Sequence, residues 1–178
     1  NATGGELVPA HTQNAYGIHI FYWWNVTINN IRWLYANEWI RISSAEYNNI
    51  NNTELYRNEK GIIVNPWTNT FVNNTQIYNN NMAVWYLAWG YNTINNSQIY
   101  NNGNGITYSN SNYNIINSTQ IYNNNANSIS VSWTGNIINN IRLYNNNLGI
   151  YIDAGAVNTK YYWINRFFDN SNDINGTL

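Results

Sequence analysis

The feature that most constrains this chain is a repeat of fixed period. Segments that begin at residues 29, 51, 73, 95, 117 and 139 align without a gap, and they read NNIRWLYAN, NNTELYRNE, NNTQIYNNN, NNSQIYNNG, NSTQIYNNN and NNIRLYNNN. The segment from Leu7 to Ile28 follows the same frame more loosely, and a further unit, Asn165 to Asn170, follows a short insertion. The period of about 22 residues falls in the range of roughly 20–50 residues that is typical of solenoids and repeat arrays.

Apolar residues recur in fixed columns of this repeat. The fifth position holds Trp33, Leu55, Ile77, Ile99, Ile121 and Leu143, and the last holds Ile28, Ile50, Val72, Ile94, Ile116 and Ile138. The twelfth position holds Ile18, Ile40, Ile62, Val84, Ile106 and Ile150, and the fourteenth holds Ile20, Ile42, Val64, Tyr86, Tyr108 and Ile152. Apolar residues separated by two indicate strands, so each unit is predicted to hold about three short strands. The 24 Ile against 7 Leu favour β structure.

Turn signals separate the predicted strands, with Asn-Asn at the start of the unit and often Asn-Asn-Asn at positions seven to nine. One unit cannot bury its own apolar face, but stacked units form continuous parallel sheets around an Ile/Val core. The predicted fold is an all-β, single-domain parallel β-helix (β-solenoid) of about seven to eight coils spaced ~4.8 Å apart. Residues 1–6 are expected to form a lead-in, residues 7–168 the coils and residues 169–178 a tail.

One unit departs from the columns. In the unit that begins at residue 117, Ser128 and Ser130 stand where Ile is expected, and Ile129 and Val131 are their neighbours. Because strand side chains alternate between two faces, this pattern predicts a local shift of the frame by one position.

Composition excludes several classes of protein. The chain has no Cys, which excludes a disulfide-stapled domain. Its 7 Lys and Arg against 8 Asp and Glu give no basic excess for nucleic acid. Aromatic residues make up 16% of the chain, which argues against disorder. No apolar run approaches the roughly 18 residues that span a membrane.

We expect the protein to lie outside the cell or at the cell surface. Only 8% of its residues are charged, against about 25% in an ordinary soluble domain, so its solubility should depend little on pH. The chain begins with Asn1, which suggests a processed or truncated chain without its targeting segment. Seven Asn-x-Ser/Thr sequons, the acceptors of N-glycans, begin at Asn1, Asn25, Asn51, Asn73, Asn95, Asn117 and Asn175.

The stretches IYNNGNGITY (99–108) and LYNNNLGIYI (143–152) carry a resemblance to a known family. They are similar to the right-handed parallel β-helix repeat of pectate-lyase-like proteins. They look most like the Asn-rich repeats of periplasmic copper-binding proteins and of carbohydrate-binding and sugar-hydrolysing proteins. The resemblance covers nearly the whole chain and implies the architecture. It says little about function, because the matching residues are scaffold positions.

Two columns of Asn stack at the start of the unit. The first comprises Asn51, Asn73, Asn95 and Asn117, and the second comprises Asn52, Asn74 and Asn96. We expect these columns to form amide ladders, in which each side chain bonds to its copies above and below. The alternative is a row of N-glycans, which would crowd one another at a spacing of ~4.8 Å. Asn1, Asn25 and Asn175 lie outside the column and are better acceptors.

Aromatic side chains are the candidates for self-association. A Tyr column is expected to face outwards, and Trp85 and Trp89 lie in the segment from Met82 to Tyr91, which departs most from the repeat. The Tyr column comprises Tyr56, Tyr78, Tyr100, Tyr122 and Tyr144. It could be a subunit contact, a sugar-stacking surface or a ladder that stiffens the sheet. The Trp residues indicate either a protein–protein surface or turns packed over the sheet.

Candidates for catalysis and metal binding are few. Glu38 and Glu59 come closest to the pair of carboxylates that glycoside hydrolysis needs, beside Arg57 and Lys60. A solvated turn is the simpler explanation of this charged group. The two histidines, His11 and His19, supply too few ligands for a metal site. No catalytic residue, cofactor or metal is therefore predicted.

The leading functional hypothesis is a structural extracellular protein. We expect no helical cap at either end, and open sheet ends would allow copies of the chain to stack end to end into a filament or sheath. The predicted partner is therefore the chain itself, with glycans as a further partner and without nucleic acid or a membrane span. One alternative is a carbohydrate-binding or polysaccharide-cleaving β-helix, and another is a fragment of a larger adhesin or surface-layer protein.

Overall fold

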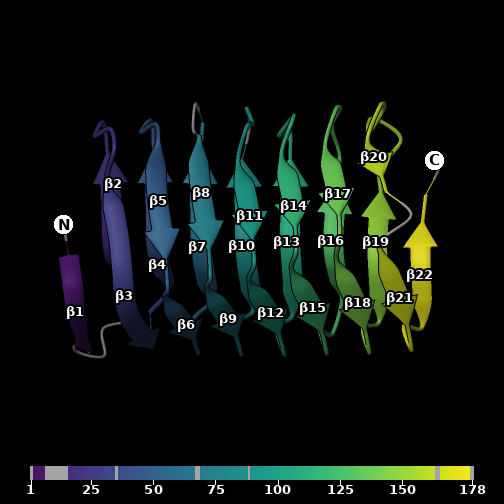
Figure 1. The fold of residues 1–178 in the computed structure, drawn as a ribbon, viewed down its shortest axis with the longest axis horizontal. Coiled ribbons are helices and arrows are strands. Elements are labelled where there is room, and N and C mark those ends of the chain that lie inside the picture. The colour runs from purple at the N-terminus through teal and green to yellow at the C-terminus, as the bar shows by residue number, and fades with distance from the viewer. Residues whose placement is uncertain are drawn as a thin grey trace.

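The structure, a computed structural model, describes residues 2–6, 16–34, 36–66, 69–87, 89–162 and 165–176. Within these residues it contains 22 strands and no helix. The strands stack along one long axis, with the N-terminus and the C-terminus at opposite ends of the stack (Figure 1). Neighbouring coils pair in parallel at a register of one repeat, as Gln76, Gln98 and Gln120 do. The predicted all-β solenoid is therefore confirmed.

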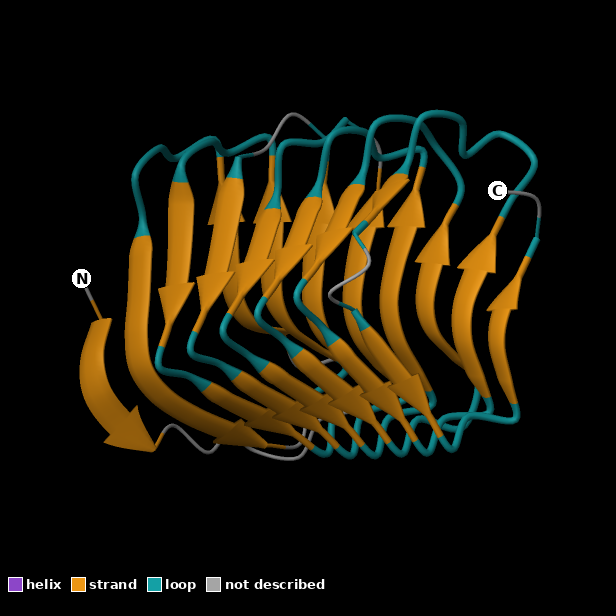
Figure 2. Ribbon diagram, turned by 45° about the vertical axis from the view of Figure 1, so that its right-hand side comes forward, coloured by secondary structure: helices purple, strands orange, loops and turns teal. Residues whose placement is uncertain are grey.

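The strands form three rows that run along the axis (Figure 2). The first row contains β5 (Asn48–Asn51), β8 (Thr70–Asn73), β11 (Thr93–Asn95), β14 (Ile115–Asn117), β17 (Ile137–Asn139) and β20 (Lys160–Tyr161). The second row contains β6 (Glu54–Tyr56), β9 (Gln76–Tyr78), β12 (Gln98–Tyr100), β15 (Gln120–Tyr122), β18 (Arg142–Tyr144) and β21 (Arg166–Phe168). The third row contains β2 (Tyr16–Phe21), β4 (Glu38–Ser43), β7 (Lys60–Asn65), β10 (Met82–Leu87), β13 (Asn104–Ser109), β16 (Asn127–Val131), β19 (Leu148–Ile152) and β22 (Asn172–Asn175).

One long strand, β3 (Thr27–Leu34), joins the first two rows, because it pairs with both β5 and β6. Strand β1 (Ala2–Glu6) pairs with β3. At the other end, β22 continues the third row by pairing with β19. Residues 2–6 and part of the segment 169–178 therefore contribute strands to the stack.

The three rows enclose one apolar core. Ile99, Ile106 and Ile116 come from the second, third and first rows, and each is fully buried. Burying one such side chain stabilises the fold by about 1.5–3 kcal/mol. In the fourteenth column Tyr86 and Tyr108 replace Ile or Val, and their rings stack 5.2 Å apart inside the core.

The predicted shift of the frame in β16 is confirmed. Ile106 pairs with Ile129 and Tyr108 pairs with Val131, each one position beyond the regular register of the repeat. The following coil compensates for the shift, since Ile129 pairs with Ile150. The shift keeps Ile129 and Val131 in the core.

The corners of the coil explain why Asn is so frequent. At the corner between the first two rows, Asn52, Asn74 and Asn96 have φ of 51°, 50° and 47°. At the corner after the second row, Asn101 and Asn123 have φ of 56° and 55°. Among non-glycine residues, Asn tolerates this left-handed conformation best, because its short amide bonds to the local backbone.

Candidate functional site

The outer face of the first row holds an uncharged groove of about 530 Å³. Two columns of side chains line it along five successive coils. One column is Asn51, Asn73, Asn95, Asn117 and Asn139, and the other includes Asn49, Phe71, Thr93, Ile115 and Ile137. None of the residues that line the groove is charged. The groove follows the axis of the solenoid.

The Asn column on this face is an amide ladder. The Nδ2 of Asn95 donates to Oδ1 of Asn73 at 3.0 Å, Asn117 donates to Asn95 at 2.9 Å, and Asn139 donates to Asn117 at 3.2 Å. An amide has two N–H donors and two acceptor lone pairs, so each rung keeps a donor and an acceptor for a ligand. The groove therefore presents the same polar group once per coil.

The second predicted column is less regular. Asn96 donates to Asn74 as expected. Asn52 instead donates to Oδ1 of Asn29 at 3.0 Å. All of these corner side chains are partly or fully exposed. They line the edge of the first row beside the groove.

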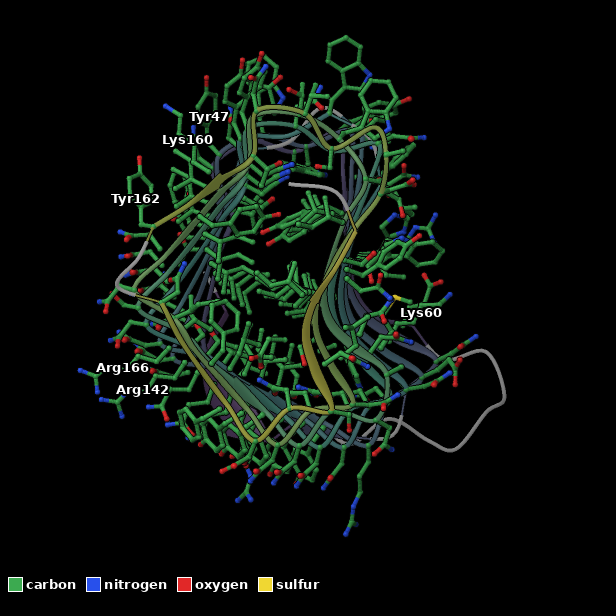
Figure 3. All side chains as sticks on the ribbon, turned by 90° about the vertical axis from the view of Figure 1, so that its right-hand side faces the viewer. Tyr47, Lys60, Arg142, Lys160, Tyr162 and Arg166 are labelled. Atoms are coloured by element: carbon green, nitrogen blue, oxygen red, sulfur yellow. The ribbon has the colours of Figure 1, made fainter. Side chains whose placement is uncertain are left out.

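An aromatic ridge runs along the turns that lead into the first row. Its exposed members are Tyr22, Trp23, Trp24, Tyr47, Trp89, Tyr91, Tyr113 and Trp133. Tyr47, Tyr91 and Tyr113 each stand two positions before a residue that lines the groove. Seen down the axis, Tyr47 projects outwards on the same side as Lys160 of β20 (Figure 3). The ridge therefore borders the first row.

Apolar area continues from the ridge into the groove. Phe71 is 42% exposed and Ile115 is 36% exposed, on strands β8 and β14. Tyr91 and Tyr113 stack with their ring centroids 5.3 Å apart. Aromatic and amide groups without charge are a surface on which a neutral polar molecule with apolar faces can bind.

The Tyr column lies on the second row and is closed to ligands on its ring faces. Successive rings from Tyr56 to Tyr144 stack 4.8–4.9 Å apart with interplanar angles of 1–6°. Phe168 continues the stack at 4.9 Å from Tyr144, and the guanidinium of Arg32 lies 5.6 Å from Tyr56 at the other end. The faces are thus occupied by neighbours, which supports the ladder interpretation over sugar stacking.

Trp85 and Trp89 lie in different surroundings. Trp85 is half-buried, its Nε1 donates to Oγ of Ser109 at 3.2 Å, and Nζ of Lys60 lies 5.4 Å from its ring. Trp89 is 56% exposed and has a φ of 49°. Trp89 therefore belongs to the aromatic ridge, whereas Trp85 packs on the third row. Their role in self-association stays a prediction.

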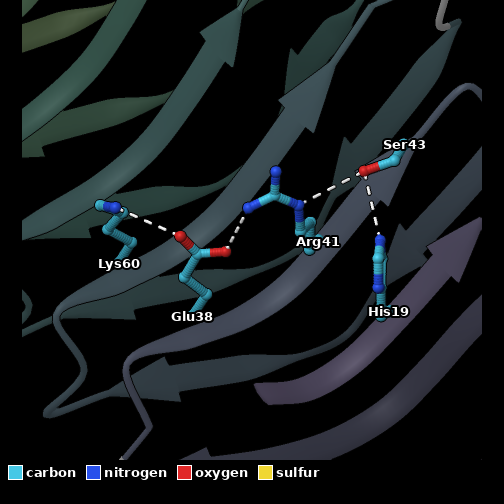
Figure 4. Close-up of polar contacts among 5 residues, drawn as sticks. All are labelled: His19, Glu38, Arg41, Ser43 and Lys60. Atoms are coloured by element: carbon cyan, nitrogen blue, oxygen red, sulfur yellow. Dashed lines mark hydrogen bonds and ion pairs between the residues drawn. The ribbon is translucent and has the colours of Figure 1, made fainter. Parts of the chain in front are cut away.

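The charged group on the third row differs from the predicted one. Glu38 accepts from Arg41 at 2.7 Å and from Lys60 at 3.2 Å, as Figure 4 shows. Glu59 instead accepts from Nδ2 of Asn81 at 2.7 Å. Glu38 and Glu59 thus have separate partners. Arg41 was not included in the predicted group, although Arg41 stands only three positions after Glu38 in the sequence.

The electrostatics of Glu38 do not suit a general acid. Burial acts to raise the pKa of its carboxyl, but the hydrogen bonds and charges of Arg41 and Lys60 outweigh burial, and the pKa is lowered. A glycosidase acid needs a raised pKa so that it keeps its proton near neutral pH. Glu38 is therefore ionised and fixed between two cations.

The remaining candidates contribute little chemistry in the described residues. His19 lies on β2, with Nε2 3.2 Å from Oγ of Ser43, while His11 and Asn1 lie outside the described residues. No group of three or more His, Cys, Asp or Glu side chains lies together in the part of the chain that the structure describes. Asn25 and Asn175 are both exposed.

The sequence reasoning missed two buried amide ladders. One follows the corner after the second row and comprises Asn58, Asn80, Asn102, Asn124 and Asn146. The other precedes the first row and includes Asn92, Asn114 and Asn136. Along each ladder Oδ1 accepts from both the backbone N–H and the side chain of the Asn one coil earlier, as Asn124 does from Asn102. The signal was an Asn at position eight in the five successive units that begin at residues 51, 73, 95, 117 and 139.

The fold first defines a class, that of the parallel β-helix repeat proteins. The chain belongs to the NosD family, because the family model described as periplasmic copper-binding protein (NosD) matches residues 3–177. The resemblance to periplasmic copper-binding repeat proteins is thereby confirmed. A family described as periplasmic agrees, in a coarse sense, with the expected location outside the cytoplasm. Among the described residues, no helix has the length and apolar character to cross a membrane.

An alginate lyase from Paenibacillus sp. str. FPU-7 is similar in structure over 75% of each chain, with 14% sequence identity and a TM-score of 0.45. This similarity is too distant to bear on function. No curated protein matches the chain.

The described residues do not fit a copper site. Copper in proteins is held by Cys, Met and His, and this chain has no Cys, one Met and two His. His19 lies on β2 and Met82 lies on β10, with β4 and β7 between them in the sheet. We therefore assign no copper chemistry to these side chains.

Proposed function

We propose that this protein is a non-catalytic β-helix that binds a neutral polysaccharide along the groove of the first row. The observation that carries the proposal is the composition of the groove, which offers amide and apolar side chains and no charge over five coils. A neutral glycan presents hydroxyl groups and apolar ring faces, so it matches both columns. An anionic polysaccharide would find no cation among the residues that line the groove.

The length of the groove supports a chain-like ligand. Five successive strands at ~4.8 Å span about 19 Å between the first and the last. Because the Asn rungs repeat once per coil, a linear ligand that runs along the axis meets an equivalent set of donors and acceptors at each coil. Binding is then multivalent, and affinity should increase with ligand length until the groove is filled.

Binding without cleavage is proposed because the described acids have no catalytic arrangement. Glu38 has a lowered pKa between Arg41 and Lys60, and it lies on the third row, away from the groove. The proposed location is outside the cytoplasmic membrane, in the periplasm or at the cell surface. A polysaccharide of the envelope or of the surroundings is available there.

A single charge in the groove tests the proposal. Thr93 lies in the middle of the groove, on β11, and Thr93→Glu places a carboxylate against the ligand. The matched control is Gln76→Glu, which adds the same charge on the exposed face of the second row. Affinity electrophoresis in gels that contain neutral polysaccharides should show retardation of the wild type and of Gln76→Glu, and loss of retardation in Thr93→Glu. Equal retardation of all three proteins would refute the groove as the site.

A second candidate function is end-to-end self-association into a filament. It is favoured by the last described coil, where all four residues of β22 are exposed and Phe168 and Ile174 are 44% and 37% exposed. A second copy of the chain that stacks on this coil would continue the three rows and cover both apolar side chains. Electron microscopy of the native protein tests it. Filaments with an axial repeat of one subunit would support it, and dispersed monomers would refute it.

A further inference from the structure

We propose that Asn25 is a site of N-glycosylation, and that the fold selects it over the sequons of the Asn ladder. Asn25 begins the sequon Asn25-Val26-Thr27 in the exposed turn between β2 and β3. Its side chain is exposed, and its backbone N–H donates to the carbonyl of Glu46 at 3.1 Å, which fixes the turn. In the described part of the chain its side-chain amide makes no hydrogen bond. This inference does not depend on the proposed glycan binding.

In two of the ladder sequons the acceptor nitrogen donates a hydrogen bond along the ladder. The Nδ2 of Asn95 donates to Asn73 and that of Asn117 donates to Asn95, at 3.0 and 2.9 Å. A sugar on either nitrogen would replace one of its two N–H groups and stand between rungs that are one coil apart. Glycans on neighbouring rungs would also crowd one another at ~4.8 Å. A glycan on Asn95 or Asn117 would therefore disturb the ladder, whereas the exposed side chain of Asn25 has no such neighbours.

The third residue of each sequon gives an independent distinction. In the ladder sequons its hydroxyl is buried and bonded to the backbone two positions earlier, as Thr75 Oγ1 is to the carbonyl of Asn73 at 3.0 Å. Ser97 and Thr119 repeat this bond at 2.8 Å. Thr27, by contrast, is half-buried on the outer face of β3. The sequon is recognised through this hydroxyl, and of these hydroxyls only the one on Thr27 faces outwards.

The neighbours of Asn25 suit a sugar. Trp23 and Trp24 are 70% and 69% exposed in the same turn. The first sugar of an N-glycan has an apolar ring face, and contact with an indole ring would remove apolar area of both from water. No charged residue lies between Phe21 and Arg32. The turn thus offers an acceptor amide, an outward hydroxyl and two aromatic surfaces.

The reaction would be catalysed by an oligosaccharyltransferase that uses a lipid diphosphate-linked oligosaccharide. The bond between Nδ2 of Asn25 and the anomeric carbon forms while the bond from that carbon to the diphosphate oxygen breaks. The lipid diphosphate leaves, and one proton of the amide passes to a base of the transferase. The product is a neutral glycosylated amide that keeps one N–H.

Site-resolved mass spectrometry tests the proposal. The full chain is secreted from cells that have an oligosaccharyltransferase, and a reporter glycoprotein from the same cells shows that the enzyme is active. Peptides are mapped after release of glycans by a peptide N-glycosidase in heavy-oxygen water, which labels each formerly glycosylated Asn. We expect label at Asn25 and none at Asn73, Asn95 or Asn117 in the folded fraction. An unlabelled Asn25, or equal label on the ladder sequons, would overturn the proposal.

Two variants separate the acceptor from the ladder. Asn25→Gln should remove the glycan mass of this site and lower the thermal midpoint of the glycan-free protein only slightly, because residue 25 has a φ of 57°, which Gln adopts less readily than Asn. The matched control Asn95→Gln should leave the glycan mass unchanged and lower that midpoint, because it distorts the ladder. A third variant, Thr27→Ala, keeps Asn25 and should still abolish the label there. Persistence of the label at Asn25 in Thr27→Ala would contradict enzymatic recognition of this sequon.

Discussion

The buried Asn ladder makes a quantitative prediction at Asn102. Its side chain is fully buried and forms five hydrogen bonds. Replacement by Ala removes all five, but most partners keep another bond. The Nδ2 of Asn80 still donates to the carbonyl of Leu55, and Oδ1 of Asn124 still accepts from the backbone of residue 102. The exception is the backbone N–H of Asn80, whose acceptor at 3.0 Å is lost.

The expected loss of stability follows from these lost hydrogen bonds. An orphaned buried N–H costs about 1–3 kcal/mol, and the remaining bonds together add roughly 1–2 kcal/mol net. Asn102→Ala should therefore reduce the free energy of unfolding by about 2–5 kcal/mol. For a chain of this size that corresponds to a fall of about 10 °C in the melting temperature. The measurement is thermal and urea unfolding followed by circular dichroism.

Asn125→Ala is the matched control, because Asn125 lies at the same corner with an exposed side chain. Its unfolding free energy should stay within about 0.5 kcal/mol of the wild type. If Asn102→Ala were as stable as Asn125→Ala, the ladder would contribute nothing beyond the turn itself. The reasoning about buried amides would then be refuted.

Three further predictions concern the core, the third row and the close contact between coils. Tyr86→Phe should raise stability by about 1 kcal/mol, because the hydroxyl of Tyr86 is buried without a partner in the described residues; a fall in the melting temperature would show that the hydroxyl is bonded. Burial also raises the pKa of Tyr86, so native stability should fall as pH rises through the ordinary tyrosine value, and less steeply in Tyr86→Phe. The lowered pKa of Glu38 stabilises the fold at pH values above the ordinary glutamate pKa, and this contribution is lost as pH falls through the lowered pKa. In Glu38→Gln the midpoint of urea unfolding should therefore decrease less on acidification than in the wild type. Gly105→Ala would place a Cβ against the carbonyl oxygen of Ser128, well inside van der Waals distance, and should destabilise the fold by about 1–3 kcal/mol, whereas a neutral result would show that the coils can separate there.

The strand rows were predictable because the repeat carries the register directly. Once Ile77, Ile99 and Ile121 occupy one column, the constant period of the repeat places them side by side in neighbouring coils. The shift at Ile129 was predictable for the same reason, since only one face of a strand enters the core. The stacking of the Tyr column follows from the common register and the spacing of the coils.

The buried ladders could not be predicted because the sequence does not show which Asn points inwards. Asn101 and Asn102 are chemically identical neighbours, but Asn101 adopts a left-handed conformation and is exposed, whereas Asn102 is buried. Whether an Asn side chain points inwards depends on which residue of the corner adopts the left-handed conformation. In an Asn-rich turn every residue tolerates that conformation.

The groove and the charged group around Glu38 could not be predicted, because they depend on how side chains of different columns lie relative to one another. The outward residues of the first row, such as Phe71 and Asn73, make a groove only because five coils repeat the same surface. The sequence offered Glu59 of the next coil as the carboxylate nearest to Glu38, but Arg41 on the same strand and Lys60 on the next strand are the partners of Glu38. The attraction between opposite charges depends on the distance between their side chains, and the position of a residue in the repeat does not determine that distance.

The central claim is that the groove of the first row binds a neutral polysaccharide, and titration calorimetry with oligosaccharides of increasing length tests it most directly. Wild-type protein is titrated with defined oligomers of several neutral linear glycans and with anionic oligomers of matched length. We expect binding of at least one neutral series, with affinity that rises with length until the ligand fills about 19 Å of groove. We expect no binding of the anionic series. Affinity that is independent of length, preference for the anionic oligomers, or absence of binding across the neutral panel would contradict the account.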